Sequence, residues 1–593
     1  MYHIWTVYLQ KIFFTKSMYI SKFIFIIISI ISFKCLATDY YINDGSTTND
    51  SFSGQAFDGS GDGSSGDPYN LLQDVFDNHD LSSGDTIFVD AGTYTESFIS
   101  VGSNDEGFTI QGVSEALTIF NGGDVTTFFL EIENAGNDDI TIKDLTIMNY
   151  GTTASNGNGK AILIGGAVSD KAITGIVISN VTFDDIDCRN TNSSYGGAIG
   201  HTSYAGSGSD LTLNNCTFLN NDSGSGACYT SAAGSGDVIT INFNDCIFHT
   251  NSSAYRCAVY RAPNSSSSVT VNWNSCIFYN NTSARTLIFP YDQAHTITNC
   301  LFYENTVTDG TEKGVFEAFS AVTYNIRNCT IVDNDGGGIY VANAGATTNI
   351  YSCIIQDNTS QNDIHEASNG TTNVYNTIYN TSSGTFETNS NNETTDATFT
   401  DAASDDYTLD TGSNGIDEGY IIGSPSLDLI GATRDGTPDI GAYEFGAAAP
   451  LPIRLVSFEC EQLNNFTNIV SWSTASEKNN NYFTVEKTKN GKEFYKVGRI
   501  NGAGNSNHLN SYTLSDLNVE KVINYYRLVQ TDLNGIKEYT KLISIDNRTD
   551  NIERYIIKKT NLLGQEINEY YQGVIINLYS DGTTEKVIKI TSF

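Results

Sequence analysis

The stretch NNCTFLNN at residues 214–221 returns as NDCIFHTN at 244–251 and as NSCIFYNN at 274–281. In each copy a cysteine stands two residues before a phenylalanine, and an asparagine follows that phenylalanine by three positions. Three interpretations of the repeated cysteine are open at this point: a disulfide framework, a metal site, or side chains packed in a core. The course of the repeat along the rest of the chain helps to separate them.

The same position recurs through the middle of the chain at intervals of 24–36 residues, which is the mark of an internal repeat. Residues i and i+2 of a strand share one face, so the cysteine and the aromatic side chain point the same way. The preceding residue is Asn, Asp or Ser, which are turn residues, and Asn and Asp tolerate a left-handed backbone. The nine equivalent positions are Leu145, Val181, Cys216, Cys246, Cys276, Cys300, Cys329, Cys353 and Thr377.

Each repeat predicts a few short strands joined by turns, a unit too small to bury its own apolar face. Stacked units bury a shared interior, which predicts a right-handed parallel β-helix. The unequal repeat lengths favour this solenoid because insertions go into loops, whereas a β-propeller needs about 40–45 evenly spaced residues per blade. We therefore expect an all-β protein: a parallel β-helix, then a β-sandwich and a small C-terminal β domain.

Cysteines in register would lie about 4.7–4.9 Å apart with parallel side chains, whereas a disulfide prefers Cβ atoms about 3.5–4.5 Å apart. A line of thiols also lacks the tetrahedral arrangement that zinc requires. We therefore predict buried, unbonded thiols that stack along the solenoid. The predicted structural ladder comprises Asn215, Cys216, Phe218, Cys246, Phe248, Cys276, Phe278, Cys300, Phe302, Cys329 and Cys353.

The chain is strongly acidic, with 31 Lys and Arg against 68 Asp and Glu and a net charge of −37 over 593 residues. Such a chain repels nucleic acid and anionic membranes, so we expect neither as a partner. The charge could suit divalent cations or neutral glycans, but an ordinary soluble, acidic secreted surface is the simpler explanation of it.

The N-terminus predicts an export signal over residues 1–37. The apolar run FIFIIISIISF (23–33) is short for a membrane span, and Cys35-Leu36-Ala37 offers small residues for cleavage. Met18 is an alternative start. No later apolar run predicts a transmembrane helix, so we expect an exported protein that is extracellular or held on the outer-membrane surface.

Family resemblances extend over most of the chain. GGAI (196–199) and FLNN, FHTN, FYNN and FYEN resemble the repeats of polymorphic outer-membrane proteins, and residues 38–447 resemble the pectin-lyase-like β-helix superfamily. In that resemblance NLLQDVFDNHD (70–80) is the capping helix. GSPSLDLIGATRDGTPDIGAYEF (423–445) resembles the choice-of-anchor segment that closes surface-attached β-helices, in which we expect Arg434 to form a structural ion pair.

The composition shifts after AAAPLP (447–452), where lysines and longer alternating strands appear. Residues 448–547 resemble a fibronectin-III-like β-sandwich, with Trp472 and Tyr525 expected in its core. Residues 548–593 resemble a type IX sorting domain, which implies the type IX export machinery as a partner. The usual proline-containing start of that domain is absent, because no proline follows Pro452.

A glycan-contact strip is the first candidate site. Arginines and aromatic residues fall on successive coils near the second strand of each repeat, where loops can carry function. The alternative is that they are scattered surface residues. The candidates are His201, Arg256, Tyr260, Arg261, Arg285, Tyr291 and Asp292.

A calcium turn is the second candidate site, because DGSGDG (58–63) matches the first half of a calcium loop. Its ligands would be Asp58, Ser60, Asp62 and Asp67. Tyr69 stands where an EF-hand needs Glu, which excludes that motif, and a flexible loop is the alternative. Calcium is the one cofactor that the sequence suggests.

The sequence assembles no base–metal or acid–acid constellation, so no catalytic residue is assigned. We therefore expect an adhesin or another glycan-contacting surface protein. The alternative is a polysaccharide lyase or glycoside hydrolase acting on an extracellular polysaccharide, since the same solenoid hosts both kinds of function.

Overall fold

The structure is a computed structural model, and the chain divides into two compact units that are described separately. The first comprises residues up to Leu429 together with Arg434–Phe445, and the second comprises Ile430–Thr433 and the residues from Gly446 onward. The described residues are 37–46, 50, 52–53, 55–57, 59, 61–115, 117–125, 128–132, 137–151, 160–165, 173–188, 197–203, 208–233, 238–261, 268–308, 313–367, 370–446, 453–464, 466–489, 492, 494–506, 510–517, 519–532, 537–540, 542–548, 556–560, 567, 573–579 and 584–589. The predicted signal, residues 1–37, lies outside them apart from Ala37.

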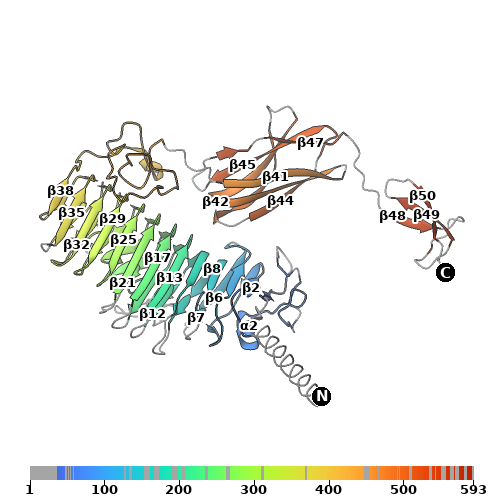
Figure 1. Ribbon diagram of the computed structural model, residues 1–593, viewed down its shortest axis with the longest axis horizontal. Helices are drawn as coiled ribbons and strands as arrows, with labels where there is room; N and C mark the ends of the chain where they lie inside the picture. The colour runs from blue at the N-terminus through green and yellow to red at the C-terminus, as the bar shows by residue number, and fades with distance from the viewer. Residues whose placement is uncertain are drawn as a thin grey trace, which may run out of the picture. The chain divides into compact units, whose positions relative to one another are not determined.

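The first unit is a right-handed parallel β-helix, as predicted, whose successive coils form three parallel sheets (Figure 1). The 22-stranded sheet contains β1 (Asp39–Ile42), β2 (Thr86–Val89), β3 (Gly92–Tyr94), β5 (Thr109–Gly112), β6 (Thr118–Val125), β8 (Thr141–Tyr150), β10 (Ile176–Asp184), β13 (Gly208–Asn214), β14 (Thr217–Leu219), β17 (Val238–Asn244), β18 (Ile247–His249), β21 (Ser268–Asn274), β22 (Ile277–Tyr279), β25 (Ala294–Thr298), β26 (Leu301–Tyr303), β29 (Thr323–Arg327), β30 (Thr330–Val332), β32 (Thr347–Tyr351), β33 (Ile354–Gln356), β35 (Thr371–Tyr375), β36 (Ile378–Tyr379) and β38 (Thr388–Ser390).

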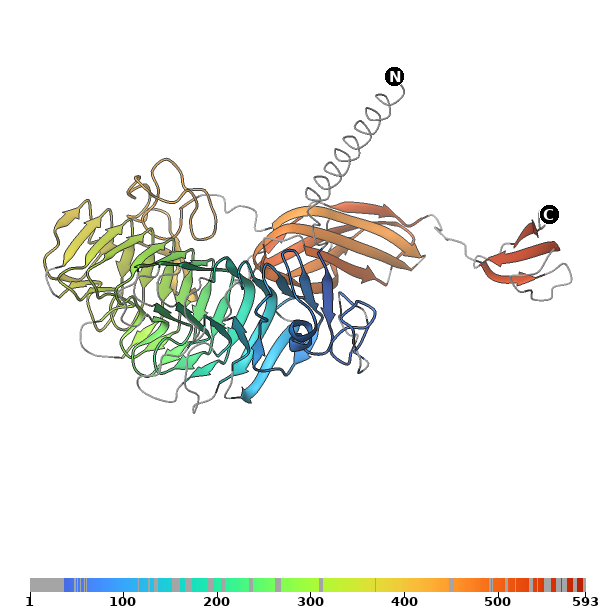
Figure 2. The same cartoon turned by 60° about the horizontal axis from the view of Figure 1, so that its bottom comes forward.

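Two smaller parallel sheets complete the coils (Figure 2). The 11-stranded sheet contains β4 (Ile99–Ser100), β7 (Leu130–Ile132), β9 (Ile162–Ile164), β12 (Ile199–Ser203), β16 (Tyr229–Ala233), β20 (Cys257–Arg261), β24 (Thr286–Phe289), β28 (Phe316–Ala318), β31 (Ile339–Val341), β34 (Ile364–Glu366) and β37 (Ser382–Ser383). The five-stranded sheet contains β11 (Asp187–Cys188), β15 (Asp222–Ser223), β19 (Ser252–Ser253), β23 (Thr282–Ser283) and β27 (Thr306–Val307).

The predicted rungs lie in register. Phe218 pairs with Phe183 and Phe248, and the series continues through Phe278 and Phe302. The rings stack nearly parallel, at 4.9 Å between Phe218 and Phe248. The six ladder cysteines are buried and free, as predicted for an unbonded thiol ladder.

All nine residues that precede the rungs have a left-handed backbone, with φ between 46° and 60°. This is the conformation in which Asn and Asp replace glycine at the smallest steric cost. The corner is thus formed by the residue that the sequence pattern singled out. The nine residues are Asp144, Asn180, Asn215, Asp245, Ser275, Asn299, Asn328, Ser352 and Asn376.

A second, interior ladder is made of asparagines three residues after the aromatic positions. Asn221 donates its Nδ2 to Asn251 Oδ1 at 2.9 Å, and Asn251 donates in the same way to Asn281. The series runs on through Asn305, Asn334 and Asn358, and ends where Asn358 Nδ2 meets Asp363 Oδ1 at 2.9 Å. The amide-to-amide bonds therefore all run towards the next coil, while the same Nδ2 atoms also donate to carbonyls of the preceding coil, as Asn221 does to Phe183.

The N-terminal end of the solenoid is covered by α2 (Leu72–Asn78), within the segment predicted to be a capping helix. Leu72, Val75 and Phe76 are buried in the solenoid core. The backbone N–H groups of Leu72 and Gln73 donate to the Glu96 carboxylate at 2.8 Å, which satisfies two free donors at the start of the helix.

Residues 397–429 and 434–445, which we call the strap, cover a flank of the last coils (Figure 1). The strap contains β39 (Phe399–Asp401), a 3-10 turn (Ala402–Ser404) and β40 (Asp406–Leu409). Its apolar side chains pack on the outward residues of four successive coils: Leu301, Val332, Ile354 and Ile378. The predicted closure at 423–445 thus acts as a lateral cover, which the linear sequence did not indicate.

The second unit contains a β-sandwich, as predicted: β41 (Ile453–Asn464), β42 (Thr467–Thr488), β43 (Tyr495–Ser506), β44 (Asn510–Asp516), β45 (Ile523–Asp532), β46 (Lys537–Tyr539) and β47 (Ile543–Asp546). The long strand β42 joins two layers, because its first half pairs with β41 and β44 and its second half with β43 and β45. Trp472 lies in the core, as predicted. The buried tyrosine is Tyr526, whereas the predicted Tyr525 is only half-buried.

The C-terminal residues form a small antiparallel sheet of β48 (Ile556–Thr560), β49 (Gly573–Tyr579) and β50 (Thr584–Lys589). Across the ranges given above, no helix combines the length and the apolar character that crossing a membrane would require.

Candidate functional site

The outer side of the 11-stranded sheet gathers aromatic and charged residues on neighbouring strands. In β24, Leu287 and Ile288 pack in the solenoid interior, whereas Phe289 contacts arginines on the outside. The register pairs Arg261 with Phe289 on one side, and Glu317 with Tyr340 further along the solenoid. Outward positions of consecutive coils therefore form one continuous row.

An ion pair lies at the centre of this row. The Glu317 side chain points away from the solenoid interior. It is nevertheless fully buried, because Arg285 and Lys313 cover it. Arg285 donates to both carboxylate oxygens, with Nε–Oε2 at 2.7 Å and Nη2–Oε1 at 2.5 Å. This two-pronged geometry is the strong form of a charged hydrogen bond. Lys313 Nζ lies 3.7 Å from Glu317 Oε1.

Aromatic rings surround the ion pair. Phe289, Tyr291 and Phe319 form a cluster with ring centroids 5.1–6.0 Å apart. The Arg285 guanidinium lies 4.7 Å from the centre of the Phe289 ring, within the range of a cation–π contact. Arg256 lies over the same ring at 5.6 Å.

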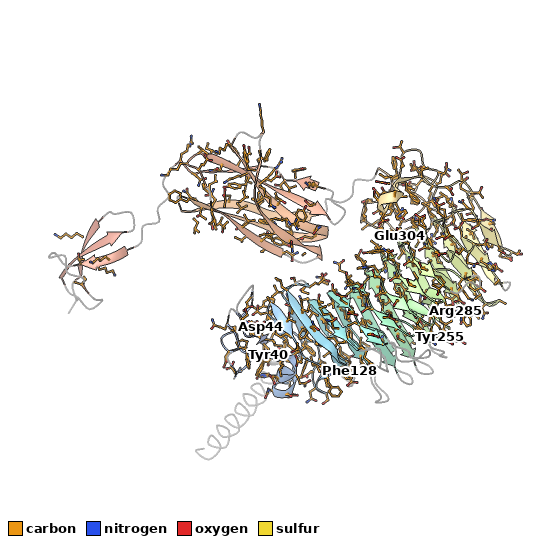
Figure 3. The ribbon with its side chains drawn as sticks, turned by 180° about the vertical axis from the view of Figure 1, so that it is seen from behind. Tyr40, Asp44, Phe128, Tyr255, Arg285 and Glu304 are labelled. Atoms are coloured by element: carbon orange, nitrogen blue, oxygen red, sulfur yellow. The ribbon has the colours of Figure 1, made fainter. Side chains whose placement is uncertain are left out.

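The most exposed ring of the group is Tyr255, with 45% of its surface accessible. Its ring lies 5.5 Å from the guanidinium of Arg256, and Figure 3 shows it near Arg285 on one side of the solenoid, away from Glu304. We call the whole group the aromatic–cationic face. It consists of Tyr255, Arg256, Arg285, Phe289, Tyr291, Lys313, Glu317, Phe319 and Tyr340.

Two residues of the predicted strip lie inside the solenoid, so the prediction is wrong for them. His201 is fully buried, with Nδ1 2.8 Å from the Tyr229 hydroxyl and Nε2 2.7 Å from Ser209 Oγ, and burial lowers its pKa to about 4. Tyr260 is also fully buried and stacks on Tyr229. A fixed inward orientation removes both from any contact with a glycan.

Arg261 faces outward but is only 5% exposed, and its Nη1 donates to Ser225 Oγ at 2.8 Å. It contributes positive charge beneath the surface instead of a contact at it. Arg256, Arg285, Tyr291 and Asp292 are the predicted residues that remain partly exposed. Their role as glycan contacts stays a prediction.

Sequence reasoning missed Tyr255, Phe289, Lys313, Glu317 and Phe319. The alternation in FEAF (316–319) could have placed Glu317 and Phe319 outward, whereas Leu287 and Ile288 both face the interior, so alternation alone does not place Phe289. A shift of register between Cys257 and Tyr260 interrupts the alternation in β20, where Ala258, Val259 and Tyr260 all pack in the interior.

The predicted calcium turn is described only in part, because Asp58 and Ser60 lie outside the described residues. Asp62 Oδ1 accepts from the Ser64 N–H at 2.9 Å, and the Asp67 carbonyl accepts from Asp62 and Gly63. The described part of this turn is closed by its own hydrogen bonds. Within the ranges described, no three His, Cys, Asp or Glu side chains form a ready metal cluster.

Arg434 forms the predicted ion pair, with Nη1 3.1 Å from Glu444 Oε2 and both side chains almost fully buried. Its Nη2 also donates to Asn299 Oδ1 at 3.1 Å and to the Gly441 carbonyl at 2.9 Å. Arg434 therefore ties the strap to itself and to a corner residue of the solenoid, a structural role.

The aromatic–cationic face can hold a ligand by ring stacking and by charge. Its one fully buried carboxylate, Glu317, is engaged on both oxygens, which makes it a poor proton acceptor. When the sequence is compared with known protein families and with curated proteins, neither a family model nor a curated protein matches it.

Proposed function

We propose that this protein is an exported surface protein, an adhesin in the broad sense, that binds an acidic glycan through the aromatic–cationic face. The observation that carries the proposal is the distribution of charge. Residues 38–447 contain ten Lys and Arg, and four of them, Arg256, Arg261, Arg285 and Lys313, lie on or directly beneath this face. In a chain of net charge −37, such a local concentration attracts anions.

The rings of the face add a second element of recognition. Sugar rings have apolar faces and polar edges, so they suit a surface on which aromatic rings adjoin charged groups. Tyr255 and Tyr291 supply accessible rings beside Arg256 and Arg285. Because equivalent residues recur from coil to coil about 4.8 Å apart, the ligand we propose is a chain molecule that extends along the solenoid.

A binding measurement on the full chain tests the proposal. We expect uronate-containing polysaccharides to be retained more strongly than neutral ones in affinity electrophoresis, and the difference to fall with salt. Arg256→Ala should weaken the retention by about tenfold, equivalent to about 1.4 kcal/mol. Lys143→Ala removes the same charge from β8 of the 22-stranded sheet and should leave retention unchanged. Equal losses for both variants would contradict a localised site.

Catalysis by a polysaccharide lyase or glycoside hydrolase is the alternative function. Both oxygens of Glu317 are engaged by cations, which favours binding without cleavage. Incubation with uronate-containing and neutral polysaccharides, with calcium present, distinguishes the two. We expect no new reducing ends and no unsaturated products, and their release would replace the adhesin proposal by the enzyme.

Export and surface display are part of the same proposal. They rest on the signal-like residues 1–37 and on the resemblance of 548–593 to type IX sorting domains. A reporter fused to residues 548–593 should reach the surface of a host with type IX secretion. Its retention in the periplasm would remove this part of the proposal and leave glycan binding to be judged separately.

A further inference from the structure

The N-terminal coils carry a marked imbalance of charge. Residues 38–142 contain 20 Asp and Glu and not a single Lys or Arg. Carboxylates that are partly buried need compensation, and side chains of opposite charge cannot provide it locally. This is the part of the solenoid in which a bound cation has the most to contribute.

The described residues Asp50, Phe52 and Ser53, which follow β1, form hydrogen bonds with buried polar groups of the first coil. Asp90 is fully buried, and its carboxylate accepts hydrogen bonds from the N–H groups of Phe52 and Ser53 at 2.8 and 2.7 Å. Asn43, also fully buried, donates its Nδ2 to Asp50 Oδ2 at 2.7 Å and to the Gln55 carbonyl at 2.6 Å. These bonds bring Asp50 back over the end of β1.

Two oxygens of this arrangement have no hydrogen-bond partner although both atoms are buried. They are Asn43 Oδ1 and Asp50 Oδ1, the free oxygens of the two groups that are joined by the Nδ2–Oδ2 hydrogen bond. A buried acceptor that is left without a partner destabilises the folded state, and more so when the group is charged. Both atoms are acceptors, so the missing partner is a donor or a cation.

The surroundings favour a cation over a water molecule. Asn43 Nδ2 also donates to Ser53 Oγ at 3.1 Å, and Ser53 Oγ donates to Asp90 Oδ2 at 2.7 Å, so Asn43, Asp50 and Asp90 belong to one hydrogen-bonded group. The Asp44 carboxylate lies against Gly92, where an added Cβ would stand only 2.7 Å from Oδ2, and Asp44 is labelled at the N-terminal end of the solenoid in Figure 3. Water would satisfy the unpaired oxygens but would leave the three carboxylates uncompensated.

We propose that this loop binds a calcium ion, with Asn43 Oδ1 and Asp50 Oδ1 as side-chain ligands and the Asp44 carboxylate beside them. Calcium takes six to eight oxygens, including amide and backbone carbonyl oxygens, with flexible geometry. Magnesium demands near-ideal octahedral geometry and retains water, which a buried amide oxygen does not suit. Among the described residues the side chains do not form a ready cluster of three carboxylates, so the amide oxygen of Asn43 is an essential part of the proposed ligand set.

The site differs from the predicted calcium turn, because it uses the preceding loop and none of the four residues Asp58, Ser60, Asp62 and Asp67. It is also independent of the glycan proposal, since it lies in the first coil and not on β20–β31. Its expected effect is on the stability of the N-terminal cap.

Calcium titration of the full chain, first stripped with a chelator, tests the proposal. Addition of calcium to about 1 mM should raise the temperature of unfolding, and the same concentration of magnesium should not. Terbium, which replaces calcium, should luminesce on excitation of tyrosine, because the Tyr94 hydroxyl donates to the Asp90 carbonyl at 3.0 Å. Excess calcium should quench that signal.

Two matched variants locate the ion. Asp50→Asn retains an oxygen for the Asn43 amide but removes the charge, and we expect it to weaken calcium binding by about 10- to 100-fold. Asp62→Asn makes the same change in the neighbouring turn and should bind as the wild type does. Circular dichroism and the unfolding temperature without calcium establish that both variants fold.

Three results would overturn the proposal. The first is a wild-type protein whose unfolding temperature and terbium signal do not respond to the ion, which would assign the unpaired oxygens to water. The second is loss of binding in Asp62→Asn with full binding in Asp50→Asn, which would place the ion in the 58–67 turn. The third is an equal response to magnesium.

Discussion

Two flanks of the same coils differ in what covers them. On β26, β30, β33 and β36 the outward side chains are mainly apolar, and the strap seals them with its own apolar residues and with Arg434. On β24, β28 and β31 the outward side chains are aromatic or charged, and they pair with one another. This chain therefore covers its apolar flank with its own strap, whereas the described residues of the strap do not pack on the aromatic–cationic face, which we call the open flank.

The largest expected effect comes from removing the strap's buried ion pair. Arg434→Ala leaves Glu444 buried without its partner, and we expect the free energy of unfolding of the first unit to fall by about 3–5 kcal/mol. Denaturant unfolding measures this loss. Hydrogen exchange should show new exposure at Leu301 and Ile354, which the strap covers.

The double variant Arg434→Met with Glu444→Leu is the matched control. Replacing a buried ion pair by apolar groups of similar volume is often close to neutral, so most of the loss should be recovered. Equal losses in the single and double variants would show that the strap does not depend on this pair.

Acid should affect the solenoid interior at β12, which belongs to the same 11-stranded sheet as the aromatic–cationic face. The pKa of His201 is lowered to about 4, against about 6.5 in the unfolded chain, so its contribution to stability is full above pH 6.5 and disappears as the pH falls towards 4. The loss amounts to about 3 kcal/mol. His201→Gln keeps a donor and an acceptor but does not titrate, and its unfolding free energy should fall less over this range.

The strap should show the opposite dependence. Burial raises the pKa of Asp439 to about 6, so its contribution is full below about pH 4 and is lost as the pH rises through 6. Hydrogen exchange at pH 4.5 and 7, followed separately in the strap and in β12, measures the two trends. Parallel behaviour of both segments would contradict the assignment of opposite signs.

The ion pair of the open flank should contribute less than that of the strap. Arg285 retains 22% exposure, so water partly screens its interaction with Glu317. We expect Arg285→Ala to lower the unfolding free energy by about 1–3 kcal/mol, less than Arg434→Ala in the same assay. A loss as large as that of Arg434→Ala would show that the Arg285–Glu317 pair stabilises the fold as much as the Arg434–Glu444 pair of the strap does.

The smallest effect on stability is expected for the most exposed ring. Tyr255→Ala should change the unfolding free energy by less than about 0.5 kcal/mol, because surface substitutions seldom cost more. The same variant should weaken retention by acidic polysaccharide in affinity electrophoresis. A normal retention with a normal stability would exclude Tyr255 from the binding face.

The sequence predicted one side of each coil well. The corner residue, the cysteine and the aromatic residue follow one another at constant spacing, so Asn215, Cys216 and Phe218 could be placed and oriented from the pattern alone. The short corner at 220–221 also repeats at constant length, which fixes the interior asparagines. Local spacing was sufficient because the turn that links these strands never changes in length.

The candidate site could not be predicted in the same way. The loop before each strand of the 11-stranded sheet varies in length. The place of a residue in the sequence repeat therefore does not show whether its side chain points into or out of the solenoid. His201 and Tyr260 were therefore placed on the wrong side. The position of the strap depends on contacts such as Asn299 with Leu427, which join residues 128 positions apart.

The one-directional asparagine ladder has a consequence for how such a chain changes in length. From Asn221 to Asn334, each interior amide donates to the asparagine of the next coil. These coils therefore present the same hydrogen-bonding groups to their neighbours. Excision of residues 222–251 would bring Asn221 onto Asn281 with the same chemistry. Only Asp363 is not interchangeable. Whole coils can therefore be gained or lost in this region without breaking the ladder. The two ends of the solenoid cannot be exchanged in this way.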